Sequence, residues 1–230
     1  EILRSKWLTY EDLLHLKGVE EMVEKFFNSK RFRFTFTYLF REDIPSPWAF
    51  FSALARFWED QGFSGQAHKQ VTLYDRLWRF LNSELPVKEK LSAPEALRAE
   101  NSVATRLEIE DLRSLLTLDY YLSGTGGQPP AWLTPQATAL REKVKTLLKA
   151  SDRPGMALPP DLPPSEVRRR MLVLGLSLDP ETLAEGYCPV LIYLPAQGRP
   201  TWYRLPPTLA KGEVGATPVE DEHGGRDRYN

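Results

Sequence analysis

Cysteine is nearly absent from this chain of 230 residues, in which Cys188 is the only one. A single cysteine cannot build an internal disulfide framework, a thiolate zinc site or an iron–sulfur cluster. Histidine is also scarce: His15, His68 and His223 are far apart, and none belongs to a metal-ligand pattern such as His-Glu-x-x-His. The sequence therefore predicts no metal site and no cofactor bound by this chain alone.

An excess of one charge and a long apolar run are missing as well. The 30 Lys and Arg residues balance 31 Asp and Glu residues, so the formal net charge is −1. General nucleic-acid binding is typical of basic chains, and we expect no nucleic-acid partner here. No run of 18 apolar residues could span a bilayer, and no signal-peptide pattern opens the chain. We expect a cytoplasmic protein without a membrane partner, cut at Glu1 from something longer.

Proline and glycine are rare in the first half of the chain. Of the 19 prolines, 15 follow Gln128, and 11 of the 14 glycines lie from Gly124 onward. The first half is therefore free to form helices, whereas turns interrupt the second. Start signals and apolar spacing predict helices that begin near Thr9, Ser46-Pro47, Val71, Ser92 and Thr134, the fourth continuing through Ile109 to Leu122. The first is the best defined, because Thr9 and Asp12 have the spacing of a capping box.

The segment from Lys30 to Phe40 is ambiguous. Aromatic residues at every second position, from Phe32 to Phe40, alternate mostly with polar ones, which is the period of a strand. Phe32, Phe36, Leu39 and Phe40 also share one face of a helix. Periodicity alone favours a strand here.

The period changes to two after a proline-rich crossing. Strands are predicted at Met171–Leu178, Val190–Leu194 and Thr201–Leu205, the last two as a hairpin. The fold class is therefore mainly α with a small appended antiparallel β-sheet (α+β). We divide the chain into a helical domain at 31–150, a proline-rich segment with the sheet at 151–208, and a polar tail at 209–230 that we expect to be disordered.

The residue types that often carry catalysis do not form a recognisable catalytic pattern in this sequence. We expect Cys188 to be a small buried apolar side chain rather than a reactive thiolate. The glycine-rich stretch Gly124–Gly127 follows a helix and runs into two prolines, so it fits an interhelix turn better than a phosphate cradle. The acidic groups around Glu20 and Glu110-Asp111 are expected on solvated helix faces. The sequence assigns no catalytic residue.

Two polar positions are more informative. Asp119-Tyr120 ends a long apolar helix, where polar side chains either close the core by hydrogen bonding or meet a ligand or a neighbouring domain. Arg168–Arg170 forms a basic triplet before the first strand, which is either a charged sheet edge or a contact to an acidic neighbour or a phosphate.

The opening segment is the most distinctive part of the sequence. Residues 1–29 read EILRSKWLTYEDLLHLKGVEEMVEKFFNS. They resemble the segment that leaves the radical SAM barrel of cobalamin-binding radical SAM proteins and enters their C-terminal domain, the DUF4080 family. The stretches Ser46–Phe51 and Asp119–Leu122 are similar to that domain's S-P-F-x-x-F and D-Y-L-L. The resemblance covers residues 1–205 and is close over the first 60.

The resemblance implies a fold and a setting for the chain. Residues 1–30 would be a connecting helix from the barrel, and Phe32–Phe40 would be helical. The parent protein would use a [4Fe–4S] cluster, S-adenosylmethionine and cobalamin. The residues that bind these groups are not in this sequence, so no catalytic residue carries over. The implied partners are the radical SAM barrel and the cobalamin-binding domain of the same polypeptide.

Two functional hypotheses follow. The first is an accessory domain that packs on the barrel and helps to close or shape the substrate site, as radical intermediates require a closed cavity. Its expected contacts to the barrel or the substrate are Trp7, Tyr10, Trp58, Asp119, Tyr120 and Arg170. The alternative is a stand-alone helical module for protein interaction, with no chemistry of its own.

Overall fold

The computed structural model describes residues 8–41, 46–84, 109–124, 128–134, 137–149 and 163–210. Several predicted features lie outside these residues. They are Trp7, the helix start at Ser92, most of the glycine-rich turn, most of the proline-rich crossing and the tail from 211.

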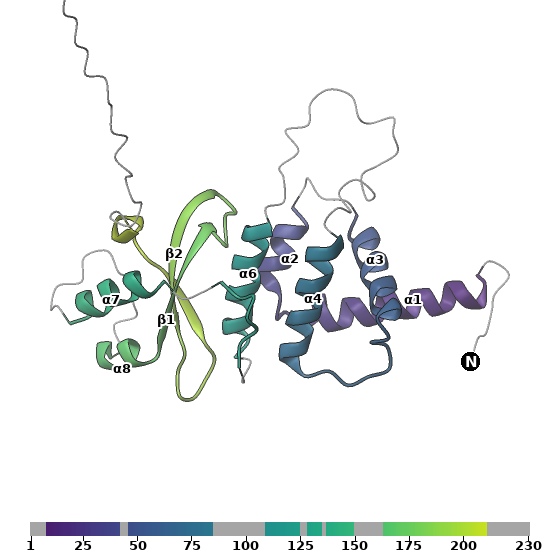
Figure 1. The fold of residues 1–230 in the computed structure, drawn as a ribbon, viewed down its shortest axis with the longest axis horizontal. Helices are drawn as coiled ribbons and strands as arrows, with labels where there is room; N and C mark the ends of the chain where they lie inside the picture. Colours follow the sequence, from purple (N-terminus) through teal and green to yellow (C-terminus); the bar gives the residue numbers. More distant parts are fainter. Residues whose placement is uncertain are drawn as a thin grey trace, which may run out of the picture.

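Helices make up most of the described chain (Figure 1). The α-helices are α1 (Tyr10–Met22), α2 (Arg33–Leu39), α3 (Pro47–Asp60), α4 (Gln70–Glu84), α6 (Ile109–Leu122), α7 (Thr138–Leu147) and α8 (Pro164–Arg169). A π-helical turn, η1 (Val23–Asn28), continues α1, and a 3₁₀ turn, η4 (Pro207–Ala210), follows the last strand. The predicted end of the first helix at Asn28–Ser29 is confirmed. The last of the predicted helices begins at Thr138, later than the start expected near Thr134.

Three strands form an antiparallel sheet in the order β1-β2-β3. They are β1 (Met171–Leu178), β2 (Glu185–Tyr193) and β3 (Thr201–Arg204). The predicted α+β fold class is confirmed, and β1 has the predicted bounds. β2 starts five residues before Val190, because Glu185 pairs with Leu178 beyond a bulge in the register.

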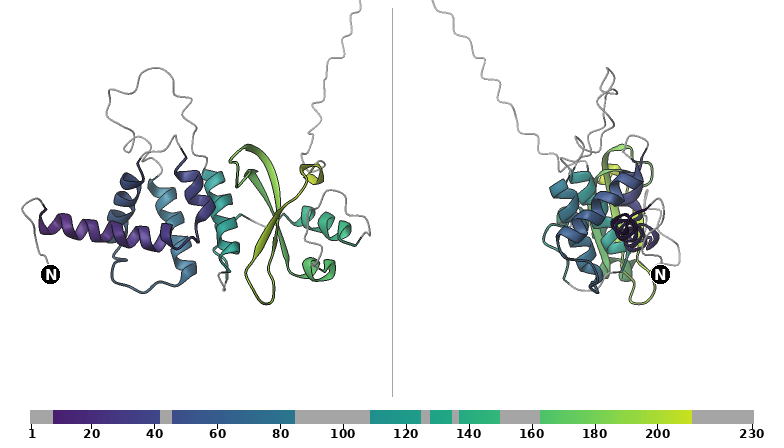
Figure 2. Two further views of the ribbon diagram at one scale, coloured as in Figure 1. Left: turned by 180° about the vertical axis from the view of Figure 1, so that it is seen from behind. Right: turned by 90° about the vertical axis from the view of Figure 1, so that its right-hand side faces the viewer.

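The sheet is covered on both faces, as Figures 1 and 2 show. Leu174, Leu176 and Leu178 point into the core of the helical body. Met171 and Val173 point the other way, into a second core with α7 and α8. Alternation along β1 thus places apolar side chains on each face. α7 falls within the predicted helical segment 31–150, and the structure places it on the sheet face opposite α6.

The aromatic segment from Phe32 to Phe40 is helical, as the resemblance implied and against its local period. A strand with Phe32, Phe34, Phe36 and Phe40 inward would expose Thr35 and Leu39. Both are buried, whereas Arg33 and Thr37, one turn apart, are exposed. The helix α2 is therefore buried on nearly all sides, and its aromatic residues face different neighbours.

The first two turns of α1 extend beyond the helical body (Figures 1 and 2). The predicted capping box is present: the backbone N–H of Asp12 donates to the Thr9 hydroxyl, and the Asp12 carboxylate accepts from the Thr9 backbone N–H at 2.8 Å. Farther along, Val19 and Met22 enter the core. Local capping supports the first turn of this helix, and contacts of His15 with Ser52 and Trp48 of α3 begin in the second turn.

Candidate functional site

Asp119 is a buried carboxylate that holds the start of α2. It lies in the last turns of α6 and accepts hydrogen bonds from the backbone N–H groups of Phe34 and Thr35, at 3.1 and 2.9 Å, and from the Thr35 hydroxyl at 2.7 Å. The residue before α2, Phe32, offers no side-chain cap. Asp119 takes that role from about 85 residues away and satisfies the N–H groups that a helix start leaves unpaired.

Burial and hydrogen bonding act in opposite directions on this carboxyl group. Removal from water raises the pKa of Asp119 to about 7, although the donors from Thr35 and Phe34 and the nearby Arg33 lower it. The same site contains Tyr74, whose hydroxyl lies 3.0 Å from the Arg31 carbonyl and 3.1 Å from the Asp119 carbonyl. Burial also raises the pKa of Tyr74. The groups around Asp119 form a fixed polar network inside the core.

The raised pKa of Asp119 predicts a pH dependence of stability. A carboxyl group with a higher pKa in the folded than in the unfolded chain binds more protons when folded, so the free energy of unfolding falls as the pH rises. The stabilisation is complete below about pH 4 and is lost above about pH 7. Between pH 5 and pH 8 the contribution of Asp119 should fall by roughly 2.5 kcal/mol.

Urea denaturation of the wild type and of Asp119→Asn across this range measures that contribution. Other groups titrate alike in both proteins, so the difference between the two pH profiles isolates residue 119. Parallel profiles from pH 5 to pH 8 would show that Asp119 does not titrate there.

A second buried carboxylate, Asp111, lies two turns earlier on α6. It accepts a hydrogen bond from the Tyr38 hydroxyl on α2 at 3.0 Å and one from the Ser177 hydroxyl on β1. The expectation that Asp111 lies on a solvated face is wrong, since only 9% of it is exposed. Asp111 and Asp119 together attach both ends of α2 to α6, and Asp111 also attaches the sheet.

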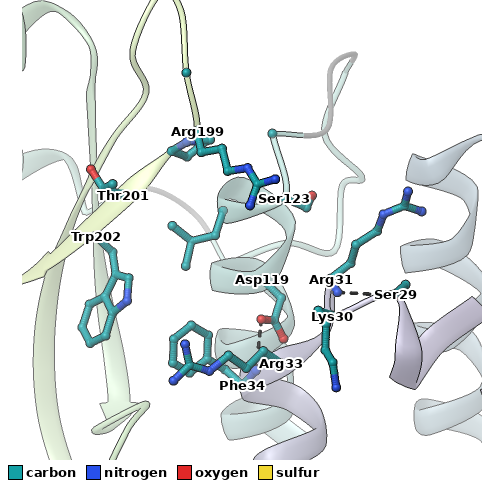
Figure 3. Close-up of a pocket in the computed structure, with 14 residues that line it drawn as sticks. Ser29, Lys30, Arg31, Arg33, Phe34, Asp119, Ser123, Arg199, Thr201 and Trp202 are labelled. Carbon is teal, nitrogen blue, oxygen red and sulfur yellow. Dashed lines mark hydrogen bonds between the residues drawn. The ribbon is translucent and has the colours of Figure 1, made fainter.

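A pocket of about 760 Å³ lies between the start of α2, the end of α6 and the β2–β3 turn. Figure 3 shows Asp119 between the two sides of the pocket, with Arg199 extending inward from the turn; Lys30 and Arg31 lie on the opposite side, and in this view their side chains lead away from Asp119. Phe34 and Trp202 form an apolar side, with ring centroids 5.7 Å apart. Arg33 lies over the Phe34 ring, 5.2 Å from its centroid. The lining is thus cationic around one aromatic wall.

The backbone at Lys30 shapes this pocket. Its φ of 59° is in the left-handed region, which residues other than glycine seldom adopt. The turn follows η1 directly and leads into α2 within three residues. The consecutive basic residues Lys30 and Arg31 are therefore placed on the pocket wall.

The predicted contact residues are dispersed over the described structure. Tyr10 is exposed on α1, and Trp58 on α3 is buried in the hydrophobic core. Arg170 directly follows α8, on the other side of the sheet. Asp119 and Tyr120 are neighbours on α6, and the Tyr120 ring packs on Tyr74 with centroids 5.3 Å apart. Of these residues, only Asp119 lines the pocket.

Sequence reasoning did not find the cations of the pocket. Arg31 and Arg33 lie in the ambiguous aromatic segment, and Arg199 lies in a turn more than 160 residues later. The sequence predicted a hairpin around Arg199, but tertiary packing determines where that hairpin lies against α6. Among these cations, only the adjacent pair Lys30-Arg31 was visible in the local sequence as a sign of a basic site.

Cys188 and the other residue types that often carry chemistry have structural positions. Cys188 is buried, as predicted, and burial raises the pKa of its thiol, which opposes thiolate formation. His15 lies 2.7 Å from the Ser52 hydroxyl. Within the described ranges, no three His, Cys, Asp or Glu side chains could hold a metal ion. Among those same residues, no helix combines the length and apolarity that crossing a membrane requires.

Comparison with known proteins identifies the family of the chain. A family model described as "Protein of unknown function (DUF4080)" matches residues 1–171. The chain belongs to the DUF4080 family. No curated protein and no solved structure matches it.

The family model matches only some of the residues that line the pocket. The DUF4080 segment ends at Met171, the first residue of β1, whereas the resemblance was expected to reach residue 205. The walls from α2 and α6 lie within the DUF4080 segment. Arg199, Thr201 and Trp202 come from the sheet that follows it. The pocket is therefore completed by residues outside the matched family segment.

Proposed function

We propose that this DUF4080 chain is the C-terminal accessory domain of a cobalamin-dependent radical SAM enzyme. In this proposal it packs on the catalytic barrel and the cobalamin-binding domain of the same cytoplasmic polypeptide and helps to close the substrate site. The parent would supply the [4Fe–4S] cluster, S-adenosylmethionine and cobalamin, and this domain would supply no catalytic group.

The exposed end of α1 is the observation that supports docking. Leu8, Tyr10, Leu14 and Leu16 are all more than a third exposed, and Tyr10 reaches 53%. Trp48, at the start of α3, is 52% exposed and packs edge-on against His15. Tyr10 and Leu14 share one face of α1, and exposed apolar side chains of this kind are typical of a surface that another domain covers. They lie on the helix that the resemblance identifies as the link to the barrel.

A surface variant of the parent enzyme tests the proposal. Tyr10 and Leu14 lie one turn apart on α1, and Tyr10→Glu with Leu14→Glu would place two charges in the covered interface. We expect turnover to fall by about tenfold, with cluster content retained. The stability of the isolated domain should change by less than about 0.5 kcal/mol, because both side chains are exposed.

Tyr187→Glu is the control, and it adds one charge where the α1 variant adds two. Tyr187 is 47% exposed, but it lies on β2, on the sheet rather than the projecting helix. Turnover should be retained in this variant. Full turnover in the α1 variant, or in a parent truncated before this domain, would reject the docking role. A native reading frame that begins near Glu1 would favour the stand-alone interaction module instead.

A further inference from the structure

The pocket between α2, α6 and the β2–β3 turn contains more positive charge than the fold uses. Lys30, Arg31, Arg33 and Arg199 line it. None of the ion pairs formed within the described part of the chain involves any of these four side chains. The carboxylate in the lining, Asp119, already accepts three hydrogen bonds from α2. Lys30 lies over the Phe27 ring and Arg33 over the Phe34 ring, 5.1 and 5.2 Å from the centroids, so Arg31 and Arg199 are the cations of this lining that no ring contact or ion pair among the described residues holds.

We propose that this pocket binds a small phosphate-bearing ligand, with the ligand's apolar or aromatic part against Trp202. Guanidinium groups bind phosphate oxygens in a bidentate manner, and several cations around one cavity suit an anion with more than one charge. The volume of about 760 Å³ falls within the range of small-molecule sites. Phe34 and Trp202 add the apolar surface that such sites use for orientation.

The cations are the donors that the ligand would meet. The Ser29 hydroxyl donates to the Phe26 carbonyl at 3.1 Å, and the Ser123 hydroxyl donates to the Tyr120 carbonyl at 2.7 Å. These hydroxyl protons are therefore used within their own helical turns. Ligand affinity would depend on Arg31, Arg199 and their basic neighbours rather than on the hydroxyl groups.

A ligand of pocket size fits better than a long polyanion. The formal net charge of the whole chain is −1, so the basic character is local rather than spread over a wide surface. Three separate segments bound the pocket, namely residues 29–34, 119–124 and 198–202. This binding is independent of whether the domain docks on a barrel.

Calorimetric titration of the purified full chain with ATP and with tripolyphosphate tests the proposal. We expect both probes to bind, and ATP to bind more tightly because its base can pack on Trp202. Arg31→Gln with Arg199→Gln should weaken both by at least about tenfold. Both arginine side chains are exposed, so the fold should be retained, which circular dichroism checks. Trp202→Leu should remove the advantage of ATP over tripolyphosphate.

The matched control removes the same charge elsewhere. Arg56 on α3 and Arg169 on α8 are exposed and lie outside the pocket lining. Arg56→Gln with Arg169→Gln should change phosphate affinity by less than about twofold. Absence of binding by both probes, or equal weakening in both double variants, would overturn the proposal. So would a hexaglutamate peptide or a single-stranded oligonucleotide that binds more tightly than ATP in a pocket-dependent way.

Discussion

Replacing Asp119 by alanine should destabilise the domain by on the order of 3 kcal/mol. The substitution leaves the N–H groups of Phe34 and Thr35 and the Thr35 hydroxyl without their acceptor. Both Phe34 and Thr35 are buried, and water can reach their N–H groups only through the pocket that Phe34 and residue 119 line. A buried donor that loses its partner costs about 1–3 kcal/mol, and relief of the desolvated carboxyl group offsets part of the sum.

Chemical denaturation at neutral pH measures this loss, and Thr35→Val provides the graded control. Valine removes only the hydroxyl bond and keeps both backbone bonds to Asp119, so its cost should be about 1 kcal/mol. Circular dichroism and amide hydrogen exchange in α2 distinguish local from global effects. If Asp119→Ala were no more destabilising than Thr35→Val, the carboxylate would not be the cap that holds α2.

The role of Asp119 explains why the sequence predicted some elements and not others. The α1 capping box joins Thr9 to Asp12, three residues apart, so the local pattern contains the whole interaction. The cap of α2 joins residues 84 and 85 positions apart. No window around Phe32–Phe40 contains Asp119, and the alternation of aromatic and polar residues in that window favoured a strand. Tertiary capping and burial on several sides determine the helix.

The pocket was even harder to predict from local sequence patterns than the cap of α2. Each of its segments has an unremarkable local pattern: a turn after η1, the end of α6 and a hairpin tip. The chain brings Arg31 and Arg199 to one cavity only after β2 and β3 have paired and the sheet has packed on α6. By contrast, β1 was predicted to the residue, because its alternation of apolar side chains is local and its ends are marked by Arg170 and Asp179-Pro180.

The largest loss is expected for Phe36→Ala, at about 3–5 kcal/mol. Phe36 is 3% exposed and its ring contacts five other aromatic rings. They are Phe27, Phe32, Phe40, Phe50 and Phe51, at centroid distances of 5.4–6.3 Å. Alanine would leave a cavity at the junction of η1, α2 and α3, and these helices cannot close around it without losing the remaining ring contacts.

Phe27→Ala is the control that separates burial from ring contacts. Phe27 packs on Phe36, Phe40 and Phe51, yet it is 42% exposed, so its truncation opens toward solvent and should cost about 1–2 kcal/mol. Phe36→Leu fills most of the same space and should lose less than Phe36→Ala, which keeps the comparison measurable if the alanine variant does not fold. Equal costs for Phe27→Ala and Phe36→Ala in urea denaturation would contradict the expectation, because the enclosed cavity, rather than the ring contacts, makes Phe36 the more sensitive position.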